Sequence, residues 1–154
     1  MTNKYYLNYY EPRIRELCHA VKERDPDAIK DAANMFLDMD IPLDAILMPA
    51  PQHTGQAVYT KEIADIIARE TGIEVMDILR CEPRETLYAL KKRGISVPNA
   101  GIYSLTAIPN GRPVYLIDNV IDIGSTVMSA GQALGINVIP LVIASTEKRE
   151  FIIQ

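Results

Sequence analysis

The side chains best suited to chemistry lie in one stretch with the sequence DNVIDIGST, which begins at Asp118. Asp118 and Asp122, four residues apart, can face the hydroxyl groups of a sugar or bind a cation. Gly124 lets the backbone approach a ligand closely, and the hydroxyl groups of Ser125 and Thr126 can donate hydrogen bonds. Together these residue types favour a site for a phosphorylated sugar.

The elements that must position this stretch are a strand before it and a helix after it. Four apolar residues at 114–117 predict a buried strand, and the apolar spacing over 125–134 suits one face of a helix. A strand, a glycine-containing turn and a helix start direct free backbone N–H groups at one point, where the helix dipole adds partial positive charge. We therefore expect phosphate at this turn; a generic phosphate-binding turn or a purely structural turn is the alternative.

The whole stretch resembles the fingerprint by which phosphoribosyltransferases bind 5-phosphoribosyl pyrophosphate (PRPP). That fingerprint has four apolar strand residues, two acidic residues, two apolar residues, Asp or Thr, a hydroxyl residue, Gly, any residue and Thr. The positions that match are Asp118, Val120, Ile121, Asp122, Gly124 and Thr126. Two positions depart from it, because Asn119 stands where a second acidic residue is usual and Ile123 stands where Thr or Ser is usual.

The resemblance implies transfer of 5-phosphoribose from PRPP to a nitrogen acceptor such as a nucleobase, with release of pyrophosphate. The residues that it places around the 5-phosphate are Asp122, Ile123, Gly124, Ser125 and Thr126. Asp118 and Asn119 would contact the ribose hydroxyls, and Asp118 would also bind Mg²⁺. Asp122 would lie near the acceptor nitrogen and relay a proton. Asp118 and Asp122 are thus the predicted catalytic residues.

A second strand–loop–helix unit lies at residues 44–70. The apolar residues 44–48 predict a strand, the sequence PAPQHTG follows it, and residues 56–70 have the apolar spacing of a helix. In phosphoribosyltransferases the loop at this position holds the leaving pyrophosphate, and this region is similar to it in outline. Pro51 and His53 are therefore predicted to contact the substrate. For His53, a loop histidine that faces solvent is the alternative.

The segment RCEPRETLYALKKRG, which begins at residue 80, carries a local excess of positive charge in a net acidic chain. Such a segment is either a solvated surface or, as the resemblance implies, a mobile loop that closes over the pyrophosphate and excludes water. Its end, LKKRG, is most similar to the phosphoribosyltransferase-like proteins associated with competence for DNA uptake. The predicted substrate contacts in this segment are Arg80, Arg84, Lys92 and Arg93.

The order of predicted elements favours an α/β fold with a mainly parallel sheet and helices on both of its faces, as in type I phosphoribosyltransferases. Ligands bind at the carboxyl ends of the strands in such sheets, so both phosphate loops can share one crevice. Further strands are expected at 73–79, 101–106 and 137–144. An Asn-Gly pair at 110–111 predicts that 101–106 pairs antiparallel with 114–117.

The N-terminal part is expected to form a small helical cap. Amphipathic helices open at Pro12 and Pro26, and Asp25 can cap the second one. Because 154 residues fit one domain, we expect residues 1–40 to be the cap or hood of a single domain whose core spans 42–154. The resemblance implies that this cap holds the acceptor.

Composition and charge narrow the range of partners. A net charge of −4 argues against extended binding of nucleic acid. No apolar run is long enough to span a bilayer and the N-terminus has no apolar signal core, so we expect no membrane association. Cys18 and Cys81 match no metal or redox spacing and are expected to be reduced thiols in the cytoplasm. Members of the resembled family commonly pair, so a homodimer is open.

Two functions compete. Asp118, Asp122 and the basic segment favour an active, Mg²⁺-dependent phosphoribosyltransferase, which is the function we expect of the two. Asn119 and Ile123 favour a non-catalytic protein that binds PRPP or a nucleotide in regulation, since the hydroxyl missing at position 123 is worth about 1–2 kcal/mol of phosphate binding. A response-regulator-like or nucleotide-binding α/β domain is a third alternative, and it predicts no affinity for PRPP.

Overall fold

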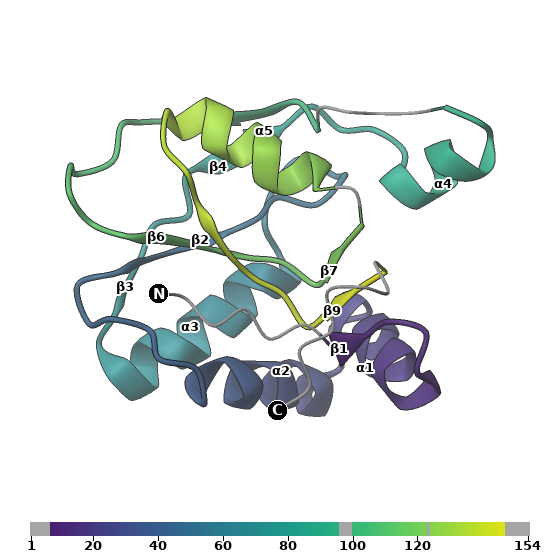
Figure 1. The fold of residues 1–154 in the computed structure, drawn as a ribbon, viewed down its shortest axis with the longest axis horizontal. Helices are drawn as coiled ribbons and strands as arrows, with labels where there is room; N and C mark the ends of the chain where they lie inside the picture. The colour runs from purple at the N-terminus through teal and green to yellow at the C-terminus, as the bar shows by residue number, and fades with distance from the viewer. Residues whose placement is uncertain (1–6, 96–99, 123, 147–154) are drawn as a thin grey trace.

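The computed structural model describes residues 7–95, 100–122 and 124–146, and their elements form a layered α/β arrangement (Figure 1). One parallel sheet consists, in order, of β3 (Glu74–Val75), β2 (Ile46–Pro49), β6 (Val114–Ile117) and β8 (Ile139–Leu141). Every residue of the central strands β2 and β6 is buried. Central parallel strands are apolar along their whole length because helices cover both faces of the sheet.

A second parallel sheet continues the first at its carboxyl end. It consists, in order, of β1 (Leu7–Asn8), β9 (Ala144–Ser145) and β7 (Val120–Ile121). The Asp118 N–H donates to the Leu141 carbonyl at 2.9 Å, and the Ile143 N–H donates to the Asn119 carbonyl at 2.9 Å. These bonds join the two sheets. One stretch of chain forms β6 and then β7, and the neighbouring stretch forms β8 and then β9.

Helices lie on both faces of the main sheet, as the sequence predicts (Figure 1). One face is covered by α1 (Pro12–Lys22), α2 (Pro26–Leu37) and α3 (Tyr59–Thr71). The other face is covered by α5 (Ser125–Leu134). Leu47 belongs to the core under the first layer and Met48 to the core under α5, because successive strand residues point to opposite faces.

The predicted starts of the two cap helices are confirmed. α1 begins at Pro12 and α2 at Pro26. The Asp25 carboxylate accepts hydrogen bonds from the N–H groups of Asp27 and Ala28 at 2.9 and 3.0 Å. Proline at the first helical position has no N–H to leave unsatisfied, so both starts are stable in this form. Within the described ranges, no helix combines the length and apolar character needed to cross a bilayer.

The predicted antiparallel pairing of residues 101–106 with 114–117 is wrong. β5 (Ile102–Ser104) pairs antiparallel with β4 (Leu79–Cys81) instead. Both edges of β6 are occupied by its parallel neighbours β2 and β8, so no edge remains for β5. The predicted strand 73–79 is divided into β3 and the start of β4. The predicted strand 137–144 is divided in the same way, into β8 and the start of β9.

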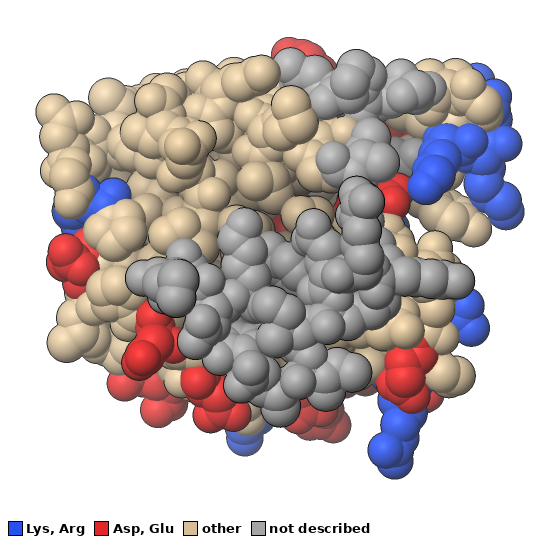
Figure 2. Space-filling model, viewed as in Figure 1, with Lys and Arg blue, Asp and Glu red and all other residues tan. Residues whose placement is uncertain are grey.

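The chain between β4 and β5 leaves the body of the molecule as an arm. We call residues 82–95 the α4 arm, after α4 (Leu87–Lys92), whose first turn is capped by the Thr86 hydroxyl accepting from the Ala89 N–H at 3.0 Å. On its return the chain is fixed to α5, since the Ile102 N–H donates to the Ser129 hydroxyl at 2.8 Å. Basic side chains gather on the α4 arm, whereas the surface over α5 is almost free of charge (Figure 2).

Candidate functional site

The predicted phosphate turn lies at the carboxyl end of β6. The strand ends at Ile117 and α5 begins at Ser125, as the sequence predicts. Gly124 precedes the helix with a φ of 83°, a left-handed conformation that strains any residue with a side chain. Ser125 is buried, and Thr126 is half-buried rather than sealed in the core. A glycine before the helix and an accessible Thr126 are compatible with an anion at this helix start.

A second helix start lies beside this one. The parallel strands β2 and β6 are paired as far as Pro49 and Ile117. The loops that lead into α3 and α5 therefore leave neighbouring strands at the same carboxyl end of the sheet. The cap residues of these helices, Val58 and Gly124, offer no side-chain acceptor to the first turn. The other described helices are capped by the side chains of Glu11, Asp25 and Thr86. At α3 the Gln52 side chain takes over part of this role, since its Oε1 accepts from the Tyr59 N–H at 3.3 Å. Helix starts whose cap residues bring no acceptor can still attract anions.

Asp118 follows β6 directly, at the same edge. Its Oδ1 accepts a hydrogen bond from the Asn119 N–H at 2.8 Å. Burial raises the pKa of this carboxyl group to about 6, against smaller lowering effects from the Asn119 N–H and the Lys22 ammonium. A carboxyl group that changes charge near neutral pH, at the end of a central strand, is typical of a functional site.

Asp122 lies in the same turn but in a different environment. Its Oδ2 is 2.9 Å from the Lys91 Nζ, and its Oδ1 accepts a hydrogen bond from the Thr146 hydroxyl at 2.5 Å. Burial raises the pKa of Asp122, but the hydrogen bonds from Thr146 and Lys91 outweigh burial and lower the pKa below its usual value. Asp122 is therefore an anion at neutral pH, whereas the pKa of Asp118 lies closer to neutral pH.

The loop after β2 is bound to the base of the α4 arm. The Cys81 N–H donates to the Gly55 carbonyl at 3.1 Å, and the Cys81 thiol donates to the Gln52 carbonyl at 3.1 Å. The Arg84 N–H donates to the His53 carbonyl at 2.8 Å. Gly55 has a φ of 114°, and a Cβ there would come within 3.0 Å of the Cys81 carbonyl oxygen. The loop and the arm are thus coupled, and Cys81 has a structural role that the sequence did not indicate.

Positive charge from two elements lies near His53. Burial lowers the pKa of His53, and the charges of Lys22 and Arg84 lower it further, so His53 is neutral at pH 7. Lys22, at the end of α1, also acts on Asp118. The Arg84 Nε is buried and has no hydrogen-bond partner among the described residues. A buried guanidinium N–H without a partner suits an anionic ligand.

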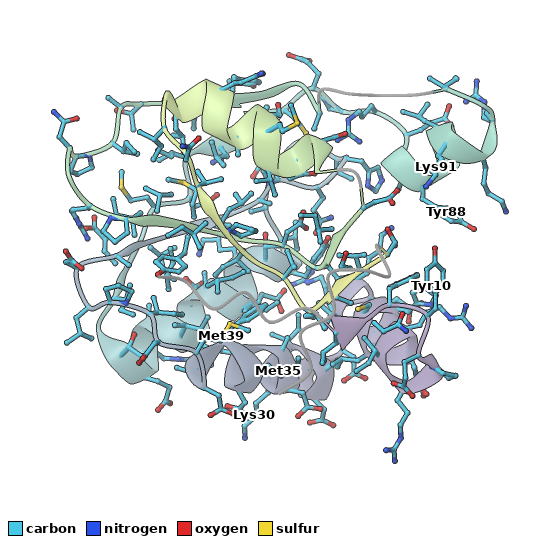
Figure 3. The ribbon with its side chains drawn as sticks, viewed as in Figure 1. Tyr10, Lys30, Met35, Met39, Tyr88 and Lys91 are labelled. Atoms are coloured by element: carbon cyan, nitrogen blue, oxygen red, sulfur yellow. The ribbon has the colours of Figure 1, made fainter. Side chains whose placement is uncertain are left out.

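The Arg84 Nη1 donates to the Glu85 carbonyl at 3.1 Å, and the other predicted basic contacts are engaged by side chains. They are engaged as follows: Arg80 with the Asp77 carboxylate at 3.1 Å, Arg93 with Glu85, and Lys92 with the ring of Tyr88, 5.5 Å from its centre. The residue of the arm that reaches the phosphate turn is Lys91 (Figure 3). The sequence analysis missed Lys91 and Lys22, because their positions depend on how helices pack against the sheet.

Asn119 is directed toward the helical cap. Its side chain is only 5% exposed, and its Nδ2 donates to the Cys18 carbonyl at 2.8 Å. Its Oδ1 has no hydrogen-bond partner among the described residues. Pro51 is buried at the start of the loop after β2, and Ile123, predicted to contact the phosphate, lies outside the described residues. Several predicted residues therefore lie in the loops at the carboxyl end of the main sheet: Asp118, Asp122, Gly124, Thr126, His53 and Arg84.

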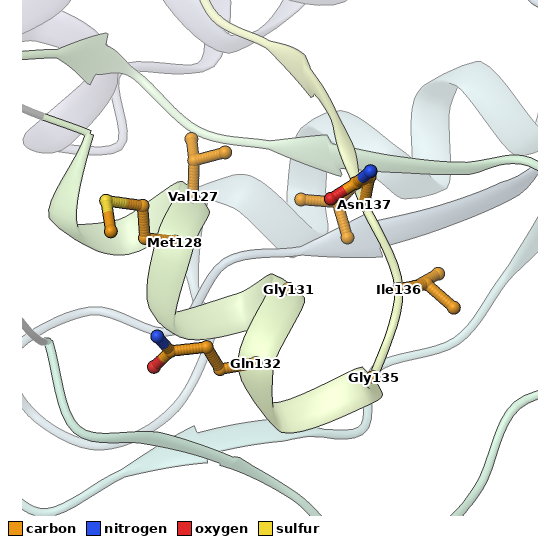
Figure 4. A pocket seen from close by; sticks show the side chains of 8 residues that line it. Val127, Met128, Gly131, Gln132, Gly135, Ile136 and Asn137 are labelled. Atoms are coloured by element: carbon orange, nitrogen blue, oxygen red, sulfur yellow. The ribbon is translucent and has the colours of Figure 1, made fainter.

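The described residues near Asp118 contain no protein-built metal site, and the two surface hollows lie elsewhere. Within the described ranges, no group of three or more His, Cys, Asp or Glu side chains could hold a metal. Surface hollows of about 520 and 470 Å³ lie along α5 and share Gly135 and Ile136 in their walls (Figure 4 shows the first). Neither is lined by Asp118, His53 or Arg84. Both hollows therefore belong to a different surface.

Comparisons with known proteins were negative: no family model, no curated protein and no solved structure matches this chain. The features of the site are two helix starts whose cap residues bring no side-chain acceptor, two aspartates in different protonation environments, and positive charge from α1 and from the α4 arm.

Proposed function

We propose that this protein binds PRPP and transfers its 5-phosphoribosyl group to a nitrogen acceptor, within a fold of the type I phosphoribosyltransferase kind. The observation that carries the proposal is a pair of helix starts, α3 and α5, whose cap residues bring no side-chain acceptor and which follow neighbouring strands, with Asp118 beside them. PRPP has phosphate groups at both ends of a ribose. A site with two anion-attracting helix starts and a carboxyl group therefore suits it.

The two ends of PRPP bind at different helix starts in this proposal. The 5-phosphate binds at α5, where Gly124 leaves the backbone accessible and the Thr126 hydroxyl adds a donor. The pyrophosphate binds at the loop before α3, near His53 and Arg84. The unpartnered Arg84 Nε can donate to it, and the charge of Lys22 stabilises the negative charge that develops as it leaves.

The reaction breaks the bond between ribose C1 and the pyrophosphate oxygen and forms a bond from C1 to the acceptor nitrogen. Asp118 holds the ribose hydroxyls, so that C1 is correctly placed for attack. Asp122, which is ionised, accepts the proton that the acceptor nitrogen loses. Lys91 must first leave the Asp122 Oδ2, to which it is bound at 2.9 Å. Movement of the α4 arm is therefore part of the proposed cycle.

Asp118 suits a Mg²⁺ ion whose other ligands come mainly from the phosphate groups of the substrate. Mg²⁺ prefers oxygen ligands and commonly uses one or two carboxylates together with substrate phosphates, so one half-buried carboxylate at the end of β6 is enough from the protein. When bound, Mg²⁺ would neutralise part of the pyrophosphate charge. Since the pKa of Asp118 is about 6, its carboxylate form is available at neutral pH.

A non-catalytic PRPP-binding protein is the second candidate, and two observations favour it. Both carboxylate oxygens of Asp122 are engaged, one by Lys91 and the other by Thr146. Asn119 supplies no carboxylate to the site and is bound to α1 instead. A site of this kind can hold the phosphates while Asp122 is withheld from the acceptor.

We also propose a cytoplasmic location. Both cysteines are free and buried, which suits a compartment where thiols stay reduced. Burial raises the pKa of the Cys18 thiol to about 12, so this thiol stays protonated and unreactive. Recovery of both thiols in reduced form from the native source would support this location.

The test is incubation with PRPP, Mg²⁺ and a panel of nucleobases, with pyrophosphate release and PRPP binding measured separately. An enzyme releases pyrophosphate with at least one base, and Asp118→Asn lowers that rate by about 100-fold or more. Asp31→Asn, which changes an exposed aspartate of α2, is the matched control and leaves the rate unchanged. Binding of PRPP without release for any base supports the non-catalytic candidate, and no binding refutes both.

A further inference from the structure

The two oxygens of the Asp122 carboxylate are held by residues of different kinds. The Thr146 hydroxyl donates to Oδ1 at 2.5 Å, and the Lys91 Nζ lies 2.9 Å from Oδ2. The Lys91 side chain is 68% exposed and belongs to the α4 arm. Thr146 is half-buried and directly follows β9. The contact at Oδ1 is therefore built into a sheet, whereas the contact at Oδ2 depends on the position of the arm.

The register of β7 and β9 places Thr146 beside Asp122. These strands are parallel neighbours, with Ile121 paired to Ser145 (Figure 1). The next residues along the chain, Asp122 and Thr146, therefore leave the two strands at the same level. The Thr146 N–H donates to the Ile121 carbonyl at 3.1 Å, which fixes the backbone of Thr146 next to the residue before Asp122. The contact between the two side chains thus follows from the strand pairing.

We propose that Thr146 is a positioning residue, which holds Oδ1 of Asp122 so that Oδ2 faces the acceptor nitrogen; this inference rests on the proposed function. When Lys91 leaves, Oδ2 becomes free while Oδ1 stays hydrogen-bonded to Thr146. A carboxylate rotates over a broad range when nothing holds it, and the Thr146 bond restricts that rotation. As the nitrogen bonds to ribose C1 and pyrophosphate leaves with the electron pair of the broken bond, the proton of the nitrogen moves to Oδ2.

The same hydrogen bond keeps Asp122 ionised after the arm has moved. Burial raises the pKa of Asp122, and the hydrogen bonds from Thr146 and Lys91, together with the charge of Lys91, outweigh burial. Tyr10 in turn acts on Lys91 and raises its pKa slightly. Once Lys91 has left, the Thr146 hydroxyl still donates to the carboxylate and favours its charged form. Only the ionised form can accept a proton from the nitrogen.

A purely structural role for Thr146 predicts a different outcome. In that role its hydroxyl group only joins the end of β9 to the turn, and its loss lowers stability without changing Asp122. Thr71 is the matched control, because it is also half-buried. Its hydroxyl group donates to the Ile67 carbonyl at 2.7 Å, which is a backbone acceptor instead of a carboxylate. Thr71→Val therefore removes a hydroxyl hydrogen bond of similar length at a distance from the turn.

The first test uses the full chain without PRPP. Carbon-13 NMR follows the titration of the carboxyl groups, and Asp122→Asn identifies the Asp122 signal. Thr146→Val, which keeps the shape of the side chain, is expected to shift the Asp122 midpoint to higher pH. Thr146→Ser is expected to restore the native midpoint, and Thr71→Val to leave it unchanged. Circular dichroism checks that each variant is folded, and Thr146→Ala gives a second reading of the same shift. An unchanged Asp122 midpoint in the folded Thr146 variants overturns the proposal.

The second test measures pyrophosphate release against pH with the base that the native protein uses. Thr146→Val is expected to lower kcat by about 10-fold through misplacement of Oδ2, with KM for PRPP within about two-fold of native because no phosphate contact is lost. The acid limb of the kcat profile moves to higher pH, and Thr146→Ser restores both. Native kcat and a native acid limb in Thr146→Val overturn the proposal. A native protein that releases no pyrophosphate refutes the enzyme itself, while the NMR titration still decides whether Thr146 controls Asp122.

Discussion

Replacement of Asp118 by Asn is expected to stabilise the folded protein at neutral pH. Burial raises the pKa of the Asp118 carboxyl group to about 6 from an ordinary value of 3.8, so the ionised form is disfavoured in the fold. One pKa unit corresponds to about 1.4 kcal/mol, and a difference of about two units sets a ceiling of about 3 kcal/mol at pH 7. Since Asp118 is partly exposed, solvent reduces the expected gain to about 1–2 kcal/mol.

The pH dependence of this gain has a definite sign. An acid whose pKa is raised by folding contributes stability that is fully present below its unfolded pKa and is lost as the pH rises through its folded pKa. The native protein and Asp118→Asn should therefore have similar free energies of unfolding near pH 4. Between pH 4 and pH 6, the free energy of unfolding of the native protein should fall below that of the variant. The Asn side chain keeps an oxygen that can accept from the Asn119 N–H, as the carboxylate does at 2.8 Å. The difference thus reports the charge alone.

The assay is urea unfolding followed by circular dichroism from pH 4 to pH 7. With a denaturant slope of about 1–3 kcal/mol per molar urea for a domain of this size, the midpoint of Asp118→Asn should exceed the native midpoint by about 0.5–1 M at pH 7 and by little at pH 4. Asp31→Asn controls for the loss of an exposed aspartate. A stability difference that is the same at every pH, or a less stable Asp118→Asn at pH 7, would refute the reasoning.

Two further substitutions test contacts of the site. Lys91→Ala removes an exposed ion pair worth about 0.2–1 kcal/mol and is expected to raise limited proteolysis within the α4 arm by up to about five-fold, whereas Lys30→Ala, at an exposed lysine of α2, leaves it unchanged. Asn119→Ala removes the bond to the Cys18 carbonyl and is expected to lower the free energy of unfolding by about 1–2 kcal/mol in urea. Equal proteolysis of the two lysine variants, or native stability of Asn119→Ala, would contradict these expectations.

The parts of the site that were predictable from sequence are those with local signals. The end of β6, the turn and the start of α5 at Ser125 follow from an apolar run, a glycine and helical spacing that lie within 20 residues of one another. The left-handed conformation of Gly124 was not predicted, but glycine is the residue type that this conformation favours. The parallel sheet with helices on both faces also follows from the order of local elements.

The parts that were not predictable depend on contacts between distant segments. An Asn-Gly pair predicts a turn, but the partner of β5 was decided by β2 and β8, which occupy both edges of β6. Of the three consecutive basic residues that begin at Lys91, only Lys91 reaches Asp122, and that choice depends on the register of α4. Lys22 enters the site through the packing of α1, to which no motif in the sequence points.

The departure from the phosphoribosyltransferase fingerprint at position 119 has a structural explanation in this chain. Asn119 faces α1 and donates to the Cys18 carbonyl, so a carboxylate at this position would place two hydrogen-bond acceptors against each other in a buried site. Lys22 lies one helical turn beyond Cys18 on the same side of α1. The Asn119 bond thus helps to hold the positive charge of Lys22 near Asp118 and His53. Asn119→Asp should accordingly loosen the packing of α1 at this position, which urea unfolding would show as a lower free energy of unfolding.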